Sequence, residues 1–314
     1  YYLLSYEMKL DKKDKDLIAY LYHHYREPLT TIGKANRMSR DQIEYRIKKY
    51  EDQKLFKKYM TIFNYDLLGY HEVIIAFIKL ELEKIKSVLS VGEVLSNYDL
   101  YVNFMFKNKK EFEEVFYKFI DKHKDKIDNF SFMITTDAEL YPLKFFDDLK
   151  KEESYNIVGF EKEVKLSKKE LELLKAIEKN GRARIIDLAN ETGLSSELIV
   201  YKLKQFHKNK VILGTRILLG MEEHGFYFGV FRMKLSKVTE SLRNKLKAFC
   251  KNHKNINSLI FGIADYNCFI QSFYQNEEEL RQTVRDIKKE VGSEILESEL
   301  LLIENEGRVK TLPF

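Results

Sequence analysis

The sequence predicts an α+β protein with two copies of a winged helix-turn-helix domain, each followed by a ferredoxin-like βαββαβ domain. The first observation is a repeat, because residues 10–70 align without a gap with residues 166–226 at an offset of 156. The second is helical spacing of apolar residues within each repeated segment, and the third is a strand-rich pattern after each of them. A repeat of this length indicates a duplicated domain rather than a solenoid.

Each repeated segment carries three short helical patterns. In the first copy, Leu17 and Leu21 share one helical face, Ile32 belongs to a second short helix, and Ile43 and Ile47 lie one turn apart on a third. Ser39 is placed to cap the third helix, with Gln42 three residues later as the return half of a capping box, and Ser195 repeats the cap without the box. We therefore expect a helix-turn-helix in each copy.

The turn before the third helix differs between the copies. Gly193 suits the left-handed backbone of a tight turn, whereas Arg37 stands at the equivalent position of the first copy. Short alternating stretches at residues 55–63 and 211–219 follow the third helices and predict a wing or hinge strand in each copy.

The segments after the wings have a different pattern. The first predicts strands at 71–82, 91–96, 99–107 and 130–134, with helices at 84–89 and 109–124. The second predicts strands at 227–235, 256–263, 267–274 and 295–305, with helices at 239–251 and 277–291. The predicted domains are residues 1–70 (helix-turn-helix and hinge strand), 71–140 (ferredoxin-like), 141–165 (connector), 166–226 (helix-turn-helix and hinge strand) and 227–314 (ferredoxin-like).

Charge and composition narrow the function classes. Residues 10–70 hold 13 basic and 9 acidic residues, and residues 166–226 hold 11 basic and 8 acidic residues. The excess positive charge of the chain, whose net charge is +5, therefore lies in these two segments. No apolar run approaches the roughly 18 residues of a membrane span, so we expect no membrane partner and a cytoplasmic protein. Cys250 and Cys268 are too few for a metal pattern and predict two buried thiols.

The motifs together resemble a known family. The run LDKKDKDLI, then SRDQIEYRIKKYEDQKLFKKY, then the distant Gly69 and a βαββαβ domain is similar to the leucine-responsive regulator (Lrp/AsnC) family of prokaryotic transcription factors. The second copy carries the family's more usual turn, TGLS at residues 192–195. The resemblance implies duplex DNA as partner, dimers or larger homo-oligomers formed through the ferredoxin-like domains, and a small-molecule effector between paired domains.

The predicted DNA contacts lie on and beside the third helix of each copy. Arg suits guanine or phosphate and Gln suits adenine, while Lys neutralises phosphates. We expect Arg40 and Arg46 to point outward from the apolar seam. The predicted DNA-binding residues are Arg40, Gln42, Arg46, Lys49, Lys57, Lys58, Ser196, Lys202 and Lys204. Because the two third helices differ, the two copies are not expected to prefer the same DNA sequence.

An alternative hypothesis is a protein-interaction scaffold with degenerate helix-turn-helix units. Residues 39–53 carry four basic and four acidic residues, a poor match to a polyanion, whereas residues 195–209 carry a net charge of +2.

The effector site rests on the resemblance alone. In the family, the turn between the second and third strands commonly carries a glycine and then an acidic or polar stretch, which here implies Gly262 and Asp265 in the second copy and Asp99 in the first as ligand-binding residues. Ordinary hairpin-turn chemistry is the alternative for both aspartates, and the one we favour.

A second alternative is enzymatic, because decarboxylases that act on sirohaem share this architecture. His71 and His224 lie near the first strand of each ferredoxin-like pattern, but the strands themselves lack the Arg/His-rich run expected of such enzymes. The sequence also lacks a phosphate-binding glycine loop, a nucleophile elbow and a paired-carboxylate motif. We therefore expect no catalytic residue, no metal and no cofactor, and a protein that is not an enzyme.

Overall fold

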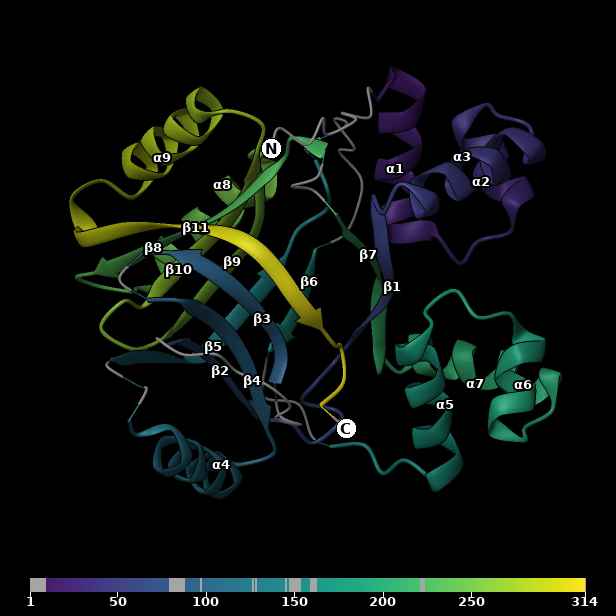
Figure 1. Cartoon of the computed structure of the whole chain (residues 1–314), viewed down its shortest axis with the longest axis horizontal. Coiled ribbons are helices and arrows are strands. Elements are labelled where there is room, and N and C mark those ends of the chain that lie inside the picture. Colours follow the sequence, from purple (N-terminus) through teal and green to yellow (C-terminus); the bar gives the residue numbers. More distant parts are fainter. Residues whose placement is uncertain are drawn as a thin grey trace. The chain divides into compact units, whose positions relative to one another are not determined.

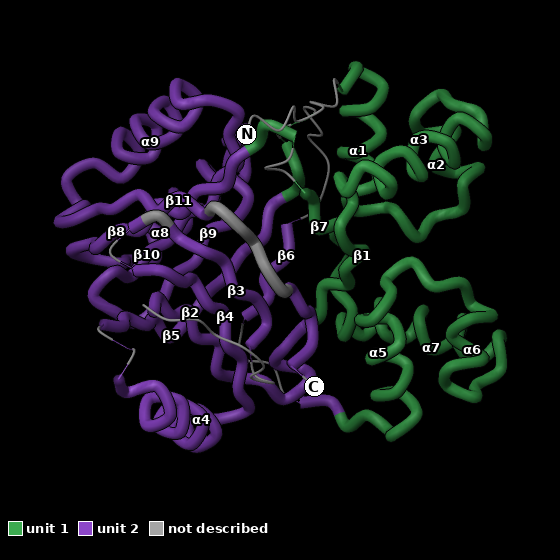
Figure 2. The backbone as a smooth tube through the Cα atoms, viewed as in Figure 1, with its two compact units in different colours: residues 1–63, 142–153, 165–226 green, residues 64–141, 154–164, 227–314 purple. Residues whose placement is uncertain are grey.

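The computed structural model describes residues 10–78, 88–96, 98–125, 127, 129–144, 146, 154–158, 163–220 and 224–313, without the side chains of residues 95 and 304–308. These residues confirm the predicted α+β fold of two helix-turn-helix units with ferredoxin-like sheets (Figure 1). The chain divides into two compact units (Figure 2). Unit 1 holds residues 1–63, 142–153 and 165–226, and unit 2 holds residues 64–141, 154–164 and 227–314.

Unit 1 contains both helix-turn-helix segments and their hinge strands. The first consists of α1 (Lys12–His24), α2 (Leu29–Asn36), α3 (Arg40–Asp52) and β1 (Phe56–Phe63). The second consists of α5 (Lys168–Lys179), α6 (Ile185–Thr192), α7 (Ser196–Lys208) and β7 (Ile212–Leu219). The hinge strands pair with each other as an antiparallel ribbon from Phe56 opposite Leu219 to Phe63 opposite Ile212, so the wing of one segment is completed by the other.

Local sequence explains where these helices begin. Ser39 and Gln42 form the predicted capping box of α3, and Ser195 accepts from the Leu198 amide at the start of α7. Asp11 with Asp14 and Ser167 with Glu170 form further capping boxes at α1 and α5, which the sequence analysis did not identify. The apolar residues expected to form the seam are buried: Leu17, Leu21, Ile32, Ile43, Ile47 and Tyr50 in the first segment.

Unit 2 is a nine-stranded sheet with helices. Its elements are β2 (Glu72–Ile78), β3 (Val88–Leu95), β4 (Leu100–Phe106), α4 (Lys109–His123), β5 (Phe130–Leu140), β6 (Tyr155–Val158), β8 (Tyr227–Leu235), α8 (Glu240–Asn252), β9 (Ile256–Ile263), β10 (Cys268–Tyr274), α9 (Glu277–Val291), a short 3₁₀ turn (Gly292–Glu294) and β11 (Ile295–Val309). The predicted helix at 84–89 falls outside the described residues as far as residue 87, and Val88 and Leu89 open β3. Part of the predicted connector forms β6, which pairs with β5.

The strand order joins the two ferredoxin-like sheets into one. It runs β2-β4-β3-β11-β8-β10-β9-β5-β6, and an added β2–β5 pairing closes eight of the strands into a ring. Two of these pairings, β3 with β11 and β5 with β9, connect the first half of the chain to the second. The pairing of two such domains is therefore satisfied inside one chain.

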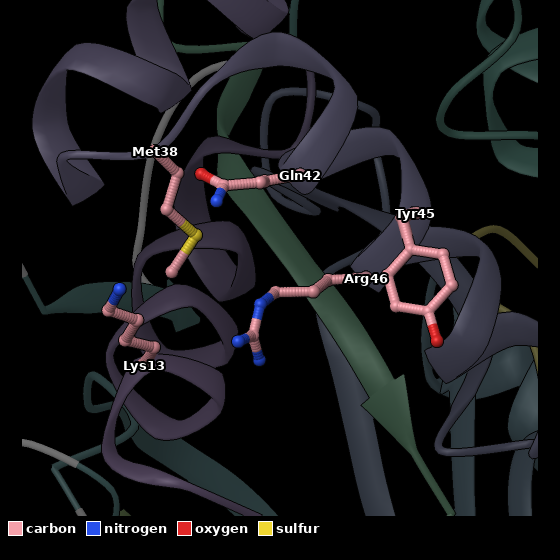
Figure 3. Close-up of a pocket in the computed structure, with 5 residues that line it drawn as sticks. All are labelled: Lys13, Met38, Gln42, Tyr45 and Arg46. Carbon is pink, nitrogen blue, oxygen red and sulfur yellow. The ribbon is translucent and has the colours of Figure 1, made fainter.

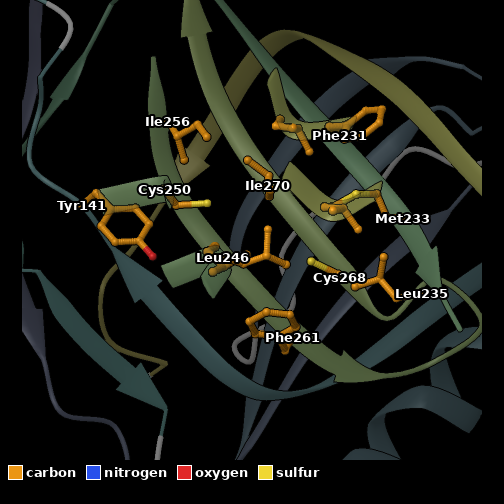
Figure 4. Packing of buried hydrophobic residues seen from close by; sticks show 13 residues of the cluster. Tyr141, Phe231, Met233, Leu235, Leu246, Cys250, Ile256, Phe261, Cys268 and Ile270 are labelled. Atoms are coloured by element: carbon orange, nitrogen blue, oxygen red, sulfur yellow. The ribbon is translucent and has the colours of Figure 1, made fainter. Parts of the chain in front are cut away.

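Helices pack on these sheets through two apolar clusters. One cluster lies between α4 and strands β2, β3 and β4, around Phe106 and Phe119. The other lies between α8, α9 and strands β8 to β10, around Leu246 and Ile287 (Figure 4). The two cysteines belong to the second cluster, which confirms them as buried thiols, and burial raises the pKa of Cys268 well above its ordinary value.

Candidate nucleic-acid interface

The turn that leads into each recognition helix, α3 or α7, has the same backbone in both halves. Gly193 has φ 68° and ψ 21°, and Arg37 has φ 54° and ψ 45°, both in the left-handed region. In each case the backbone N–H at this position closes the end of the preceding helix. The departure from glycine at residue 37 therefore leaves the helix-turn-helix geometry unchanged, at a cost in backbone strain.

Arg37→Gly is expected to raise the free energy of unfolding by about 1 kcal/mol, because a left-handed backbone costs a non-glycine residue roughly 1–2 kcal/mol and glycine returns part of this as chain entropy. Chemical denaturation of both proteins measures the difference. Gly193→Arg is the matched control and should destabilise by a similar amount, since a Cβ there meets nothing closer than the Lys169 ammonium at 3.8 Å. Equal stability of Arg37→Gly and the parent would contradict strain at this turn.

Arg46 does not point freely outward, which corrects the prediction from the sequence. Its guanidinium forms an ion pair with Asp14 of α1 and donates to Oδ2 of Asp11 at 3.2 Å. The Tyr50 hydroxyl donates to the same Asp14 carboxylate at 2.6 Å. The Asp14 side chain is 3% exposed and that of Arg46 is 21% exposed. Arg46 therefore neutralises a buried carboxylate between α1 and α3.

The second half repeats this pair at the same offset. Lys202 of α7 contacts Oε1 of Glu170 in α5 at 2.9 Å, and the two side chains are 29% and 19% exposed. Burial alone would raise the pKa of Glu170, but the Lys202 ammonium and the hydrogen bonds from Ser167 hold it below its ordinary value. Lys202, like Arg46, is thus tied to the first helix of its own unit instead of presented to solvent.

The other predicted DNA contacts lie in different surroundings. Arg40 is 67% exposed and pairs with Glu44 one turn along α3, a type of contact worth less than about 1 kcal/mol. Lys58 is largely buried in an ion pair with Glu178 at 2.6 Å. Lys57 and Lys204 are exposed, and Lys49 and Ser196 are half-buried.

Gln42 is exposed, but its carbonyl oxygen is already engaged. Oε1 accepts from the Ser39 amide at 3.0 Å within the capping box, which leaves the Nε2 group to donate. A bidentate contact with adenine needs both amide atoms, so this cap works against the expected adenine contact.

The structure places a pair of tyrosines on the recognition helices that the sequence analysis missed. Tyr45 is 71% exposed on α3, and Tyr201, its equivalent at the offset of 156, is 55% exposed on α7. Neither belongs to the buried seam. The available signal was an aromatic residue that recurs in both halves at a position between seam residues, where core packing does not require one.

A small hollow lies beside Tyr45. Lys13 of α1, Met38 of the turn, and Gln42, Tyr45 and Arg46 of α3 line a cavity of about 150 Å³ (Figure 3). Small-molecule sites usually occupy roughly 300–1,000 Å³. The hollow is therefore a feature of the exposed recognition surface rather than a site of effector size.

The two helix-turn-helix segments are fixed to each other within unit 1. Helix α1 packs against β7 and α5 packs against β1, so each segment contacts the other's strand. The Arg26 guanidinium donates to the carbonyl oxygens of Gly181 and Ala183, and Arg182 donates to the Tyr59 hydroxyl at 3.3 Å. Burial lowers the pKa of Arg26. The recognition helices are thus presented by one packed body.

The residues implied as an effector site lie in unit 2 with structural partners. Asp265 pairs with Lys234 at 2.8 Å, and Asp99 has an exposed side chain while its backbone bonds to Ile78 and Val94. A Cβ at Gly262 would lie 2.3 Å from Cγ of Met133 and 2.5 Å from the Ile134 carbonyl oxygen, so glycine permits the close approach of β9 to β5. Gly262 therefore has a packing role.

One buried cation near these turns was missed. Arg232 of β8 is 4% exposed, pairs with Glu299, and lies over the rings of Tyr98 and Tyr266 at 5.1 and 4.3 Å. Its Nη1 has no hydrogen-bond partner among the described residues. The signal in the sequence was an arginine in the middle of the mostly apolar strand YFGVFRMKL.

The two histidines weighed for catalysis are engaged in different units. His71 lies in unit 2 with Nδ1 at 3.3 Å from the Asp66 carboxylate, and His224 lies in unit 1 with Nε2 at 3.1 Å from the Gln53 carbonyl. In the described part of the chain, no cluster of three His, Cys, Asp or Glu side chains is placed to hold a metal ion, and no helix is long and apolar enough to cross a membrane.

The chain is similar in sequence to archaeal regulators. It is 24% identical over 139 residues to an uncharacterized HTH-type transcriptional regulator of Pyrococcus furiosus, covering 44% of this chain and 93% of that protein. It is 28% identical over 114 residues to the HTH-type transcriptional regulator FL11 of Pyrococcus abyssi, covering 33% of this chain and 76% of that one. No protein-family model matches the chain. The resemblance to regulators is thus supported over less than half of the sequence.

A likeness over nearly the whole chain comes from an enzyme. The siroheme decarboxylase NirDL superposes with a TM-score of 0.60 at 14% identity, covering 95% of this chain and 93% of that one, and its complex with an iron-uroporphyrin III analogue gives 0.59. At this identity the likeness establishes the fold alone. It overturns the expectation that the chain is not an enzyme, which rested on the missing Arg/His-rich run and the missing catalytic motifs, because an enzyme shares the fold over 95% of this chain.

Proposed function

We propose that this chain is a sequence-biased duplex-DNA-binding transcriptional regulator of the Lrp/AsnC type, which acts as a pseudo-dimer within one chain. The observation that carries the proposal is the pair of helix-turn-helix segments in unit 1, joined through β1 and β7, each with a solvent-exposed recognition helix. The names of the archaeal relatives support it. An HTH pair of this kind presents two helices to the major groove.

The proposed DNA contacts are those predicted residues, exposed or half-buried, that lie outside the ion pairs with Asp14, Glu170 and Glu178. They are Arg40, Gln42, Lys49, Lys57, Ser196 and Lys204. Arg46, Lys202 and Lys58 are excluded from this set because each neutralises a largely buried carboxylate of unit 1. Small-molecule control through the turns that carry Asp99 and Asp265, and association of chains through unit 2, belong to the proposal as further expectations.

The affinity for a labelled DNA duplex taken from upstream of the gene that encodes this chain is expected to fall steeply as the salt concentration rises. Each neutralised phosphate contributes a slope of about −0.9 in log K against log salt. Arg40→Ala should weaken binding by about 5- to 100-fold, as expected for one lost base or phosphate contact. Fluorescence anisotropy across a salt series measures both quantities.

Arg281→Ala is the matched control for Arg40→Ala. Arg281 is similarly exposed and pairs with Glu277 one turn away, but it lies on α9 in unit 2. Its replacement should leave DNA affinity unchanged. Absence of binding to any duplex at low salt, or an equal loss in both variants, would contradict the proposed function.

Decarboxylation of an iron tetrapyrrole is the second candidate, supported by the fold shared with NirDL over 95% of this chain. Arg232, a buried cation with an unpartnered Nη1, is the group in unit 2 suited to a substrate carboxylate. Titration of the protein with sirohaem tests this candidate. A shifted absorption band followed by mass-spectrometric loss of carboxyl groups would establish it, and an unchanged spectrum would reject it.

A further inference from the structure

The exposed faces of the two recognition helices differ in chemistry. At the offset of 156, Leu198 on α7 replaces Gln42 on α3, and Val200 replaces Glu44. Leu198 and Val200 are 38% and 39% exposed, whereas the neighbouring seam residue Ile199 is fully buried. The apolar character of α7 therefore extends from its buried seam onto its outer face.

The apolar residues of α7 lie beside basic ones. Leu198, Tyr201 and Lys204 follow each other at intervals of three residues, which places them as neighbours on one exposed stripe. Lys202, whose ammonium lies 6.0 Å from the centre of the Tyr201 ring, is held by Glu170 and is not part of this stripe. A stripe that is apolar near its N-terminus and basic beyond it fits a polyanion that presents methyl groups, and fits an apolar protein groove less well.

In duplex DNA, the N-terminal turns of a recognition helix reach the base edges of the major groove. The C5-methyl of thymine is the methyl group on those edges, which otherwise present mainly hydrogen-bond donors and acceptors. A leucine set against a donor or acceptor leaves that group unsatisfied, whereas a leucine against a methyl buries apolar surface.

We propose that α7 selects thymine through contacts of Leu198 and Tyr201 with C5-methyl groups, while α3 reads its half-site by hydrogen bonds from Arg40 and Gln42. The inference rests on the proposed DNA-binding function and assigns its specificity. Because both helices belong to one packed unit, the thymine-selecting half-site lies on a fixed side of the operator. The chain therefore binds its operator in one orientation.

Replacing thymine by deoxyuridine removes the methyl group alone and gives a direct test. A footprint on the DNA upstream of the gene that encodes this chain defines the operator. Each thymine in the operator is then replaced, one at a time, by deoxyuridine. Affinity should fall about fourfold at one or two positions in one half-site, as expected for one methyl group withdrawn from an apolar contact. Binding unaffected by every replacement would overturn the inference but leave the proposed function standing, whereas failure to bind any duplex would remove both.

The reciprocal variants identify the residue responsible. Leu198→Gln should abolish the loss on deoxyuridine substitution, and Gln42→Leu should create a new sensitive position in the other half-site. Both positions are exposed. Gln42→Leu removes the capping box of α3, but α7 begins without a capping box, so we expect α3 to form without one as well. Unchanged melting temperatures would establish that both variants fold. The contrary result is that Leu198→Gln changes the sedimentation of the protein and leaves the loss of affinity on deoxyuridine substitution as it was. That result would show that Leu198 contacts another protein chain and would also overturn the inference.

Discussion

Arg46→Ala is expected to lower the free energy of unfolding of the chain's first helix-turn-helix by about 3–5 kcal/mol, the usual result of removing one partner from a buried ion pair. With Arg46 in place the Asp14 carboxylate is almost fully buried, and the variant leaves it with only the Tyr50 hydroxyl and the Asp11 amide as hydrogen-bond donors. Neither neighbour carries a compensating charge. Denaturant titration followed by circular dichroism measures the loss.

A double variant separates charge from packing. Asp14→Asn together with Arg46→Met removes both charges, keeps a hydrogen-bond acceptor for Tyr50 and fills much of the arginine's volume, so it should recover most of the stability. Lys202→Met in the second half should cost less than Arg46→Ala, since the Glu170 side chain is 19% exposed and partly solvated. Full stability of Arg46→Ala with weakened DNA binding would contradict the structural role and restore Arg46 as a DNA contact.

These expectations show where sequence reasoning succeeds and where it fails. The periodicity around Leu17, Ile43 and Ile47 identified the helices and their buried faces, because the spacing of apolar residues and the capping pattern are local properties. The same spacing predicted that Arg46 points away from the seam, but it could not predict that Asp14 of α1 lies there as its ion-pair partner. Asp14 and Arg46 are 32 residues apart, and their contact depends on how α1 packs on α3.

Local sequence patterns could not predict which strands pair between the two halves, because strand pairing also depends on contacts between distant segments. Strand propensity predicted the stretches at 55–63 and 211–219, but each alone is equally compatible with a wing folded on its own domain. Their pairing with each other, and the pairings of β3 with β11 and β5 with β9, are set by contacts between distant segments. Gly262 illustrates the consequence, since its closest neighbours belong to β5 of the other half.

Gly181→Ala is expected to separate the two helix-turn-helix segments. A Cβ at residue 181 would lie 2.4 Å from both the Tyr25 hydroxyl and the Tyr59 carbonyl oxygen. The Tyr59 carbonyl oxygen belongs to the backbone and accepts a hydrogen bond from the Gly181 amide at 3.2 Å. Forcing a methyl group into such a site costs about 1–3 kcal/mol. Gly193→Ala is the control, because its Cβ has room and bears the backbone strain alone.

The effect on DNA should exceed the effect on stability. Two half-sites read by one rigid unit bind with an avidity that can exceed either alone by 10²–10⁴-fold, and this gain is lost when the geometry is lost. Gly181→Ala should therefore weaken binding to the complete operator far more than binding to a duplex with one half-site. Equal losses on both duplexes would show that residue 181 supports folding without aligning the readers.

This glycine also shows that the contact between the two segments is asymmetric, although the segments are repeats of one another. Gly181 and Tyr25 are equivalent at the offset of 156, yet they face each other across the contact between the segments. Burial raises the pKa of Tyr25 to about 12, so its hydroxyl stays protonated and donates to the Met60 carbonyl at 3.0 Å. Only one of two facing positions has room for a large ring, so a tyrosine on one side requires a glycine on the other. The two segments are therefore held in one asymmetric arrangement, which agrees with the proposed binding of an operator with unlike half-sites.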